Sequence, residues 1–86
     1  MMRITVSPRF EKSYKSLPKR IKEKAKEQEL VFRKNPFDPR LKTHRLTGRE
    51  KEAWAFSINY SYRIKFIFLT EDEVLFLDVG THEIYK

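Results

Sequence analysis

Three apolar segments follow one another in the second half of the chain, and they limit its fold more than any other feature. They are "AWAFSIN", "YRIKFIFL" and "VLFLDVG", and only "YS" and "TEDE" separate them. Apolar and polar residues alternate in the first two segments, as they do in a strand with one buried face. Because connections this short are typical of hairpins, the sequence predicts three antiparallel strands in chain order.

The alternation also assigns side chains to the two faces of this sheet. One face would carry the apolar residues Trp54, Phe56, Ile58, Ile64, Phe66 and Phe68. The other face would present Arg63, Lys65 and Ser57 to solvent, and His82 and Tyr85 would follow from the adjoining strand. Three strands bury little apolar surface by themselves, so we expect helices to cover the apolar face.

The first half of the chain supplies those helices after one short strand. "RITVS" alternates β-branched and polar residues and predicts a strand. Ser7 and Pro8 then predict a helix start, since a serine side chain caps free amides and proline suits the first helical position. Pro18 interrupts this helix and opens a longer one that ends near Asn35. Its expected buried stripe consists of Ile21, Ala25 and Phe32, widened by Leu30 and Val31.

Strand, two helices and three strands make an α+β pattern, and residues 1–86 suffice for one domain only. Residues 1–45 hold fourteen basic and five acidic side chains, a net charge of +9, which favours a polyanion or an acidic protein as partner. Cysteine is absent, which excludes disulfides and thiolate metal sites and favours a reducing cytoplasm. No window approaches the roughly 18 apolar residues of a membrane span, so no membrane partner is expected.

Several short motifs, in their order and spacing, resemble the RelE/ParE superfamily, the small toxins of type II toxin–antitoxin systems. They are "SPRFEKSYKSLP", "NPFDPRLKTHRLTG", "AWAFSINYSYRIKFIF" and "VGTHEIY", and together they cover nearly the whole chain. The resemblance implies a β-α-α-β-β-β fold, with a curved antiparallel sheet and two N-terminal helices packed on one face. "HRLTG" and "GTH" are most similar to the RelE and YafQ branch.

Members of that branch cleave mRNA on the ribosome, so the resemblance implies a metal-independent endoribonuclease that needs no cofactor. Its expected partners are the ribosome, mRNA and a cognate acidic antitoxin that holds it inactive. Two alternatives stay open. One is a ParE-like toxin that inhibits DNA gyrase without being a nuclease, and the other is an inactive relic that only binds its antitoxin.

Metal-free RNA cleavage needs a base for the 2′-hydroxyl, an acid for the leaving oxygen and positive charge for the phosphorane. Histidine suits proton transfer near neutral pH, so we expect His82 first and His44 second as acid or base. Arg63 is expected to bind the scissile phosphate, and Tyr85 to orient the 2′-hydroxyl or stack on a base. The expected electrostatic supports are Lys42, Arg45, Lys65, Lys19, Arg20, Lys22, Lys24 and Lys26.

The chain also departs from the YafQ pattern, and each site residue has a plainer interpretation. Ser57 and Ser61 stand where YafQ-like toxins carry a histidine and an aspartate, and Tyr85 lies one residue closer to His82. His82 would otherwise only cap backbone groups, and Tyr85 would only pack its ring. Arg63 would pair with Asp78 or Glu52 across the sheet, His44 would be a plain surface residue in a loop, and the charged helix face would simply be solvated.

Overall fold

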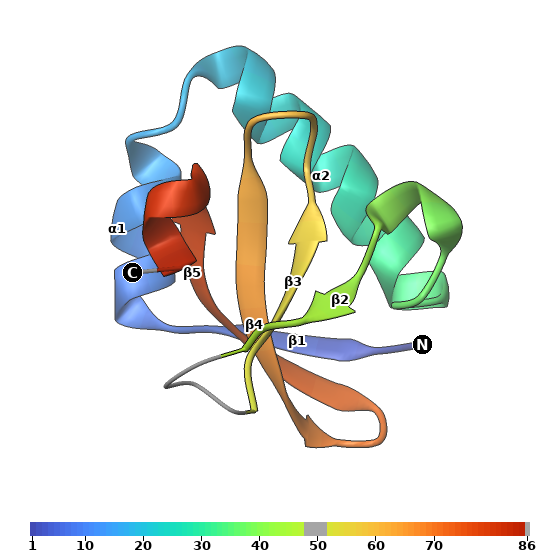
Figure 1. The fold of residues 1–86 in the computed structure, drawn as a ribbon. Coiled ribbons are helices and arrows are strands. Elements are labelled where there is room, and N and C mark those ends of the chain that lie inside the picture. Colours follow the sequence, from blue (N-terminus) through green and yellow to red (C-terminus); the bar gives the residue numbers. More distant parts are fainter. Residues whose placement is uncertain (48–51, 86) are drawn as a thin grey trace.

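The sheet is the centre of the computed structural model, which describes residues 1–47 and 52–85. Its strand order is β1-β5-β4-β3-β2, and the helices α1 and α2 cover one face (Figure 1). The strands are β1 (Arg3–Val6), β2 (His44–Arg45), β3 (Trp54–Ser57), β4 (Arg63–Thr70) and β5 (Glu73–Gly80). The helices are α1 (Pro8–Lys15) and α2 (Lys19–Lys34), with the 3₁₀ turns η1 (Pro39–Leu41) and η2 (His82–Tyr85).

The predicted α+β fold is confirmed, and two features of the sheet go beyond the prediction. The strands β3, β4 and β5 form the expected antiparallel meander. β1, however, pairs with β5 in parallel, with Val6 opposite Phe76. A short edge strand, β2, also pairs with β3, so His44 lies in a strand and not in the expected loop. A strand of two exposed residues leaves no alternation in the sequence by which to predict it.

The first helix begins where the sequence predicts it. The Ser7 side chain caps α1 by accepting a hydrogen bond from the backbone N–H of Phe10 at 3.0 Å, and Pro8 occupies the first turn. The same Ser7 hydroxyl donates to the carbonyl of Leu77 in β5 at 2.8 Å. One side chain therefore both starts α1 and fixes it beside the strand that leads to the C-terminal turn.

An aromatic cluster joins α2 to the sheet. Phe32, which is fully buried, stacks on Phe56 with ring centroids 4.7 Å apart and meets the edges of Phe66 and Phe76. Such pairs contribute about 0.5–1.5 kcal/mol each beyond the area that they bury. The expectation that Leu30 widens the buried stripe is wrong. Leu30 is 62 % exposed. The buried positions of α2, which include Phe32, recur every three or four residues, and this spacing places Leu30 on the outer side of the helix.

The second face of the sheet is not open, and this corrects the sequence prediction. The chain turns back after β5, and η2 lies across this face (Figure 1). Ser57, Lys65 and Asp78, on this face, are less than 10 % exposed, and Lys65 donates a hydrogen bond to η2. None of the helices in residues 1–47 and 52–85 is long and apolar enough to cross a membrane.

Candidate active site

The register of the sheet places the candidate side chains on the face that carries η2. His44 is opposite Ala55, Ala55 is opposite Lys65, and Lys65 is opposite Asp78, so these residues form one row across four strands. Directly opposed residues of a sheet share a face. Arg63, two residues before Lys65 and opposite Gly80, points to the same side.

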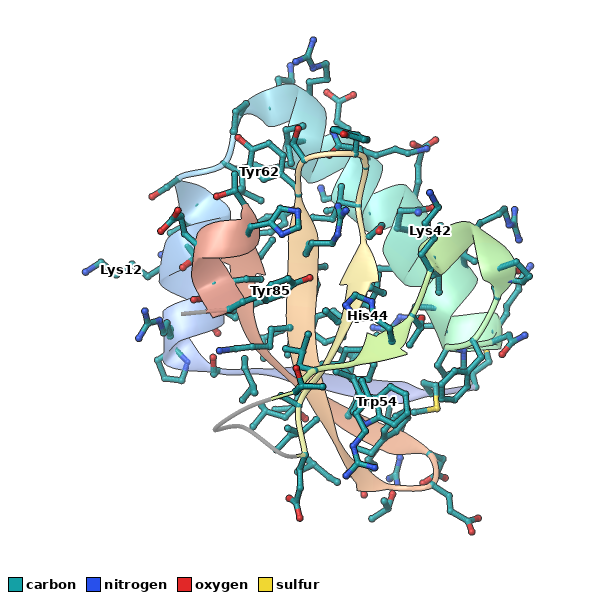
Figure 2. All side chains as sticks on the ribbon, in the orientation of Figure 1. Lys12, Lys42, His44, Trp54, Tyr62 and Tyr85 are labelled. Carbon is teal, nitrogen blue, oxygen red and sulfur yellow. The ribbon has the colours of Figure 1, made fainter. Side chains whose placement is uncertain are left out.

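The ring of Tyr85 lies between the two histidines of the chain. Its centroid is 6.4 Å from that of His44 and 5.5 Å from that of His82, with interplanar angles of 89° and 84°. His44 comes from β2 at one edge of the sheet and Tyr85 from η2 at the C-terminal end (Figure 2). The fold therefore brings together three residues that are separated by up to 41 positions in the sequence.

His44 is exposed, and its ring is oriented by the backbone. Its Nδ1 atom lies 3.1 Å from the carbonyl oxygen of Lys42, a residue with a left-handed backbone conformation (φ 52°). A carbonyl only accepts hydrogen bonds, so this contact selects the tautomer that carries its proton on Nδ1. The lone pair is then on Nε2, as a general base requires.

Arg63 is fixed by carbonyl groups of its own hairpin. Its Nη1 atom donates to the carbonyl oxygens of Asn59, Tyr60 and Tyr62 at 2.6, 3.1 and 3.1 Å. The alternative pairing with Asp78 is not seen, because Asp78 forms its ion pair with Arg9 at 3.1 Å. The guanidinium is thus held at the end of the sheet where η2 begins.

The Tyr85 hydroxyl is buried beside this guanidinium. Burial raises the pKa of Tyr85 above the ordinary value, and the nearby charge of Arg63 opposes that increase. Within the described residues, the hydroxyl has no hydrogen-bond partner of ordinary geometry. Arg63 therefore acts on Tyr85 mainly through its charge.

Arg63 and His82 line one hollow on this face. Its volume is about 410 Å³, within the range of roughly 300–1,000 Å³ that is typical of small-ligand pockets. Its other lining residues are Tyr60, Ser61 and Thr81. Tyr60 and Thr81 were not predicted as site residues. The only signal for Tyr60 was an aromatic residue between Asn59 and Ser61 in a tight turn.

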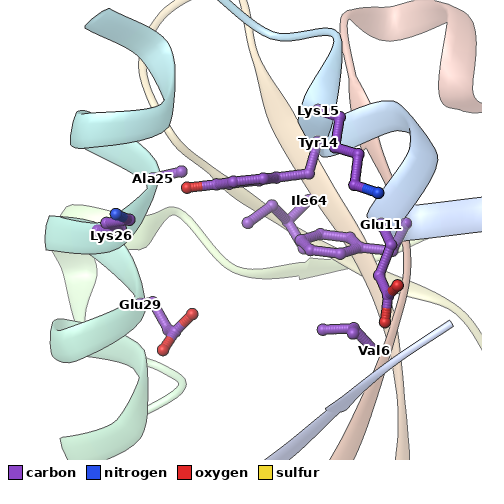
Figure 3. A pocket seen from close by; sticks show the side chains of 9 residues that line it. Val6, Glu11, Tyr14, Lys15, Ala25, Lys26, Glu29 and Ile64 are labelled. Atoms are coloured by element: carbon purple, nitrogen blue, oxygen red, sulfur yellow. The ribbon is translucent and has the colours of Figure 1, made fainter. Parts of the chain in front are cut away.

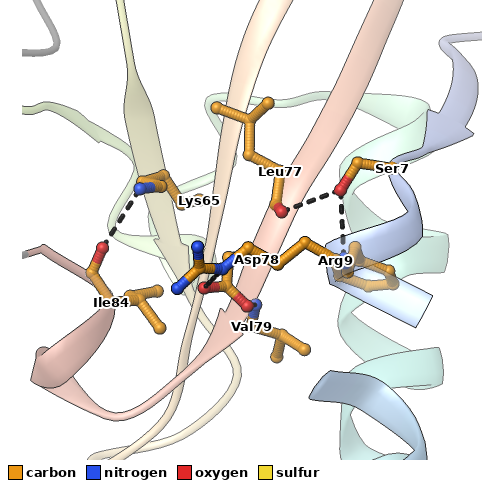
Figure 4. A network of polar contacts seen from close by, with 8 residues as sticks. Ser7, Arg9, Lys65, Leu77, Asp78, Val79 and Ile84 are labelled. Atoms are coloured by element: carbon orange, nitrogen blue, oxygen red, sulfur yellow. Dashed lines mark hydrogen bonds and ion pairs between the residues drawn. The ribbon is translucent and has the colours of Figure 1, made fainter. Parts of the chain in front are cut away.

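Lys65 anchors the turn that carries His82 and Tyr85. Its Nζ atom donates to the carbonyl oxygen of Ile84 at 3.1 Å (Figure 4). Gly80 permits the close approach, because a Cβ atom there would lie 2.9 Å from Cγ2 of Ile84. The expectation that Lys65 offers its charge to RNA is therefore corrected: its side chain is buried beneath η2 and holds the backbone.

The other basic residues of the prediction lie in two separate places. Lys42 and Arg45 are exposed beside His44 at the β2 edge. The five predicted supports in α2, from Lys19 to Lys26, are on the helix side of the sheet. There, Lys22 lies 5.9 Å from the centre of the Tyr14 ring and Lys24 pairs with Glu27 at 3.7 Å. They do not converge with Arg63, and their contact with RNA stays a prediction.

A second hollow, between α1 and α2, has a different character. It is lined mainly by apolar groups of Val6, Phe10, Tyr14, Ala25 and Ile64, and charged side chains stand at its rim (Figure 3). No histidine lines it. His82 instead lines the hollow beside η2, and His44 lies beside the ring of Tyr85 at the β2 edge.

Comparisons with solved structures identify the same fold in several bacterial toxins. YafQ from E. coli strain BL21(DE3) matches with a TM-score of 0.78 and 24 % identity over 98 % of this chain and 97 % of that one. The YoeB/ParE toxin from Agrobacterium tumefaciens matches with a TM-score of 0.78 and 16 % identity over 94 % and 99 %. The E. coli DinJ–YafQ toxin–antitoxin complex matches with a TM-score of 0.75 and 25 % identity over 96 % and 94 %.

No family model and no curated protein sequence matches the chain. The resemblance to the RelE/ParE superfamily is nevertheless confirmed at the level of the fold, over nearly the full length of the described toxins. The chain thus has the architecture of the YafQ and YoeB toxins.

Replacing Lys65 by methionine should loosen η2 and leave the core in place. Methionine keeps most of the apolar stem but removes the donor to the Ile84 carbonyl, and hydrogen bonds to charged groups contribute about 1.5–3 kcal/mol. Hydrogen exchange of the Ile84 amide should therefore accelerate by about tenfold or more. Lys26→Met on the exposed surface of α2 is the matched control. Unchanged exchange in Lys65→Met would contradict the anchoring role.

The ionisation of Tyr85 should be displaced upwards and should depend on Arg63. We expect its pKa to lie above about 10, and to rise further in Arg63→Gln, since burial then acts without an opposing charge. Because the folded-state pKa is raised, the corresponding stability is fully present below about pH 10 and is lost as the pH rises through the folded-state value. NMR titration of the tyrosine rings measures this, and Tyr85→Phe identifies the signal. A pKa at or below the ordinary value would contradict the burial of the hydroxyl.

Proposed function

We propose that this chain is the toxin of a type II toxin–antitoxin system and that it acts in the cytoplasm as a ribosome-dependent mRNA endoribonuclease. The observation that carries the proposal is the shared hollow of Arg63 and His82, with Tyr85 between the two imidazoles. The fold shared with YafQ and YoeB toxins supports the class of protein. The motifs "HRLTG" and "GTH" favour the nuclease branch over a gyrase inhibitor.

The proposed reaction needs only groups of the protein and of the RNA. The 2′-hydroxyl oxygen attacks the adjacent phosphorus while a base takes its proton. The bond from phosphorus to the 5′ oxygen then breaks, and an acid protonates that oxygen, which leaves a 2′,3′-cyclic phosphate and a 5′-hydroxyl. Proton transfer by positioned side chains accelerates such steps by roughly 10² to 10⁴.

We assign the base to His44 and the acid to His82. The tautomer of His44 selected by the Lys42 carbonyl leaves Nε2 ready to accept a proton. His82 lies in the hollow with Arg63, so it can protonate a leaving oxygen of a phosphate bound there. Arg63, already fixed by three carbonyl groups, stabilises the charge of the phosphorane without reorganising. The Tyr85 hydroxyl is buried, so this residue would act through its ring, which lies beside both imidazoles.

Loss of His82 should slow cleavage while the fold persists. His82→Ala should reduce the rate of mRNA cutting in a cell-free translation reaction by about 10² to 10⁴, the usual effect of a lost acid or base. Glu71→Gln, in the exposed turn between β4 and β5, is the matched control and should cut at the normal rate. Intact message with the unaltered chain would remove the nuclease proposal. Inhibition of purified gyrase in a supercoiling assay would then support the ParE-like alternative.

We further propose that an acidic antitoxin restrains the chain. The net charge of +9 over residues 1–45 attracts an acidic partner, and β2 lies at one edge of the sheet with exposed His44 and Arg45. A partner strand added along this edge would cover His44, one of the two proposed proton-transfer groups. Toxins of this fold have been crystallised with antitoxins, as in the E. coli DinJ–YafQ complex.

Co-expression with the adjacent open reading frame should yield a complex on affinity purification of either chain. Association should weaken as salt increases, because long-range attraction between the basic and acidic chains is screened. A charge-neutral variant of the β2 edge, Arg45→Gln, should lower the yield more than Lys34→Gln at the end of α2. Recovery of this chain alone, at normal yield and with growth unaffected, would contradict an antitoxin.

A further inference from the structure

Tyr60 is the most exposed of the large apolar or aromatic side chains in residues 1–47 and 52–85. It lies in the turn between β3 and β4, its exposed fraction is 93 %, and it lines the hollow with Arg63 and His82. The fold gains little from a ring that is almost wholly in water, since burial is the source of hydrophobic stabilisation. The folded core therefore does not explain why a tyrosine stands here.

The turn that carries this ring is held by many hydrogen bonds. The Asn59 side chain accepts from the backbone N–H groups of Ser61 and Tyr62, both at 2.9 Å. The N–H of Ile58 donates to the carbonyl of Tyr62 at 2.9 Å, which closes the hairpin. The Tyr60 backbone is thus fixed on both sides, and only the side-chain torsions of the ring are free.

Arg63 connects this turn to the candidate active site. Its Nη1 atom donates to the Tyr60 carbonyl at 3.1 Å, while its charge also acts on the Tyr85 hydroxyl. A phosphate bound by the rest of the guanidinium would therefore lie near the Tyr60 backbone, in the hollow that the Tyr60 side chain also lines. In a single strand of RNA, the base belonging to that phosphate is free to rotate towards a neighbouring aromatic surface.

We propose that Tyr60 binds a nucleobase of the substrate by stacking and so positions the nucleotide whose phosphate meets Arg63. The proposal rests on the proposed function, because it assumes that the ligand of this hollow is RNA. A tyrosine offers a rigid aromatic face with two side-chain torsions, so little conformational freedom is lost on stacking. Stacking on one ring tolerates any base, so Tyr60 would set the placement of the strand and not its sequence.

The test is an NMR titration of the intact chain with three probes: adenosine 3′-monophosphate, adenosine and inorganic phosphate. The nucleotide should shift the Tyr60 ring protons upfield and also move the Arg63 side-chain N–H signal, whereas phosphate should move Arg63 alone. Tyr60→Leu should weaken nucleotide binding by about fivefold or more and leave phosphate binding unchanged. Tyr60→Phe should bind as the unaltered chain does. Phe37→Leu, which removes an exposed ring outside the hollow, is the control.

Tyr60 signals that do not move with the nucleotide, or a Tyr60→Leu variant that binds it normally, would overturn the proposal. The titration involves neither ribosomes nor cleavage, so it is independent of the test of the nuclease. Stacking without mRNA cleavage would leave Tyr60 as a nucleotide-binding residue and remove the nuclease. Cleavage that persists while Tyr60 shows no stacking would retain the nuclease and remove the role of Tyr60.

Discussion

The reversal of the chain at Gly80 is the constraint on which the whole candidate site depends. A C-terminal segment that only followed β5 would fray, since terminal residues open with free energies near zero. The hydrogen bond from Lys65 to the Ile84 carbonyl supplies about 1.5–3 kcal/mol, while fixing one residue opposes folding by about 1–2 kcal/mol. One bond therefore orders about one residue. The rest of η2 must be held by packing. Ile84 packs closely against Gly80, which has no Cβ atom, and the Tyr85 ring packs beside the two imidazoles.

Local patterns were enough to predict the elements that carry most of the core. The alternation around Phe56 and Phe66 identified β3 and β4, and the pair Ser7 and Pro8 identified the start of α1. The direction of β1 was not predictable in this way, because alternation is the same in parallel and antiparallel pairs. The edge strand β2 was missed because its two residues are exposed and have no period.

The roles of the candidate site residues stay predictions, but the structure shows where these residues lie. His82, Arg63, Tyr85 and His44 were all expected from motifs, and the structure gathers them on one face of the sheet. Lys65 was assigned to the solvent-facing side from alternation alone. Alternation assigned Lys65 to the correct face of the sheet, but it carries no information on what covers that face. The segment that covers Lys65 lies 19 residues further along the chain.

Two separate basic regions follow from this arrangement, and they act over different distances. The basic residues of α2 belong to the layer opposite η2, whereas Arg63 lies on the face that carries η2. In the proposed function, their charges add to the long-range attraction of RNA, which decays over about 8 Å at physiological ionic strength. Arg63 instead acts at contact distance in a partly buried place, where screening by salt is weak. In the proposed function, the sheet thus separates the charge that attracts RNA from the charge that acts on a single phosphate.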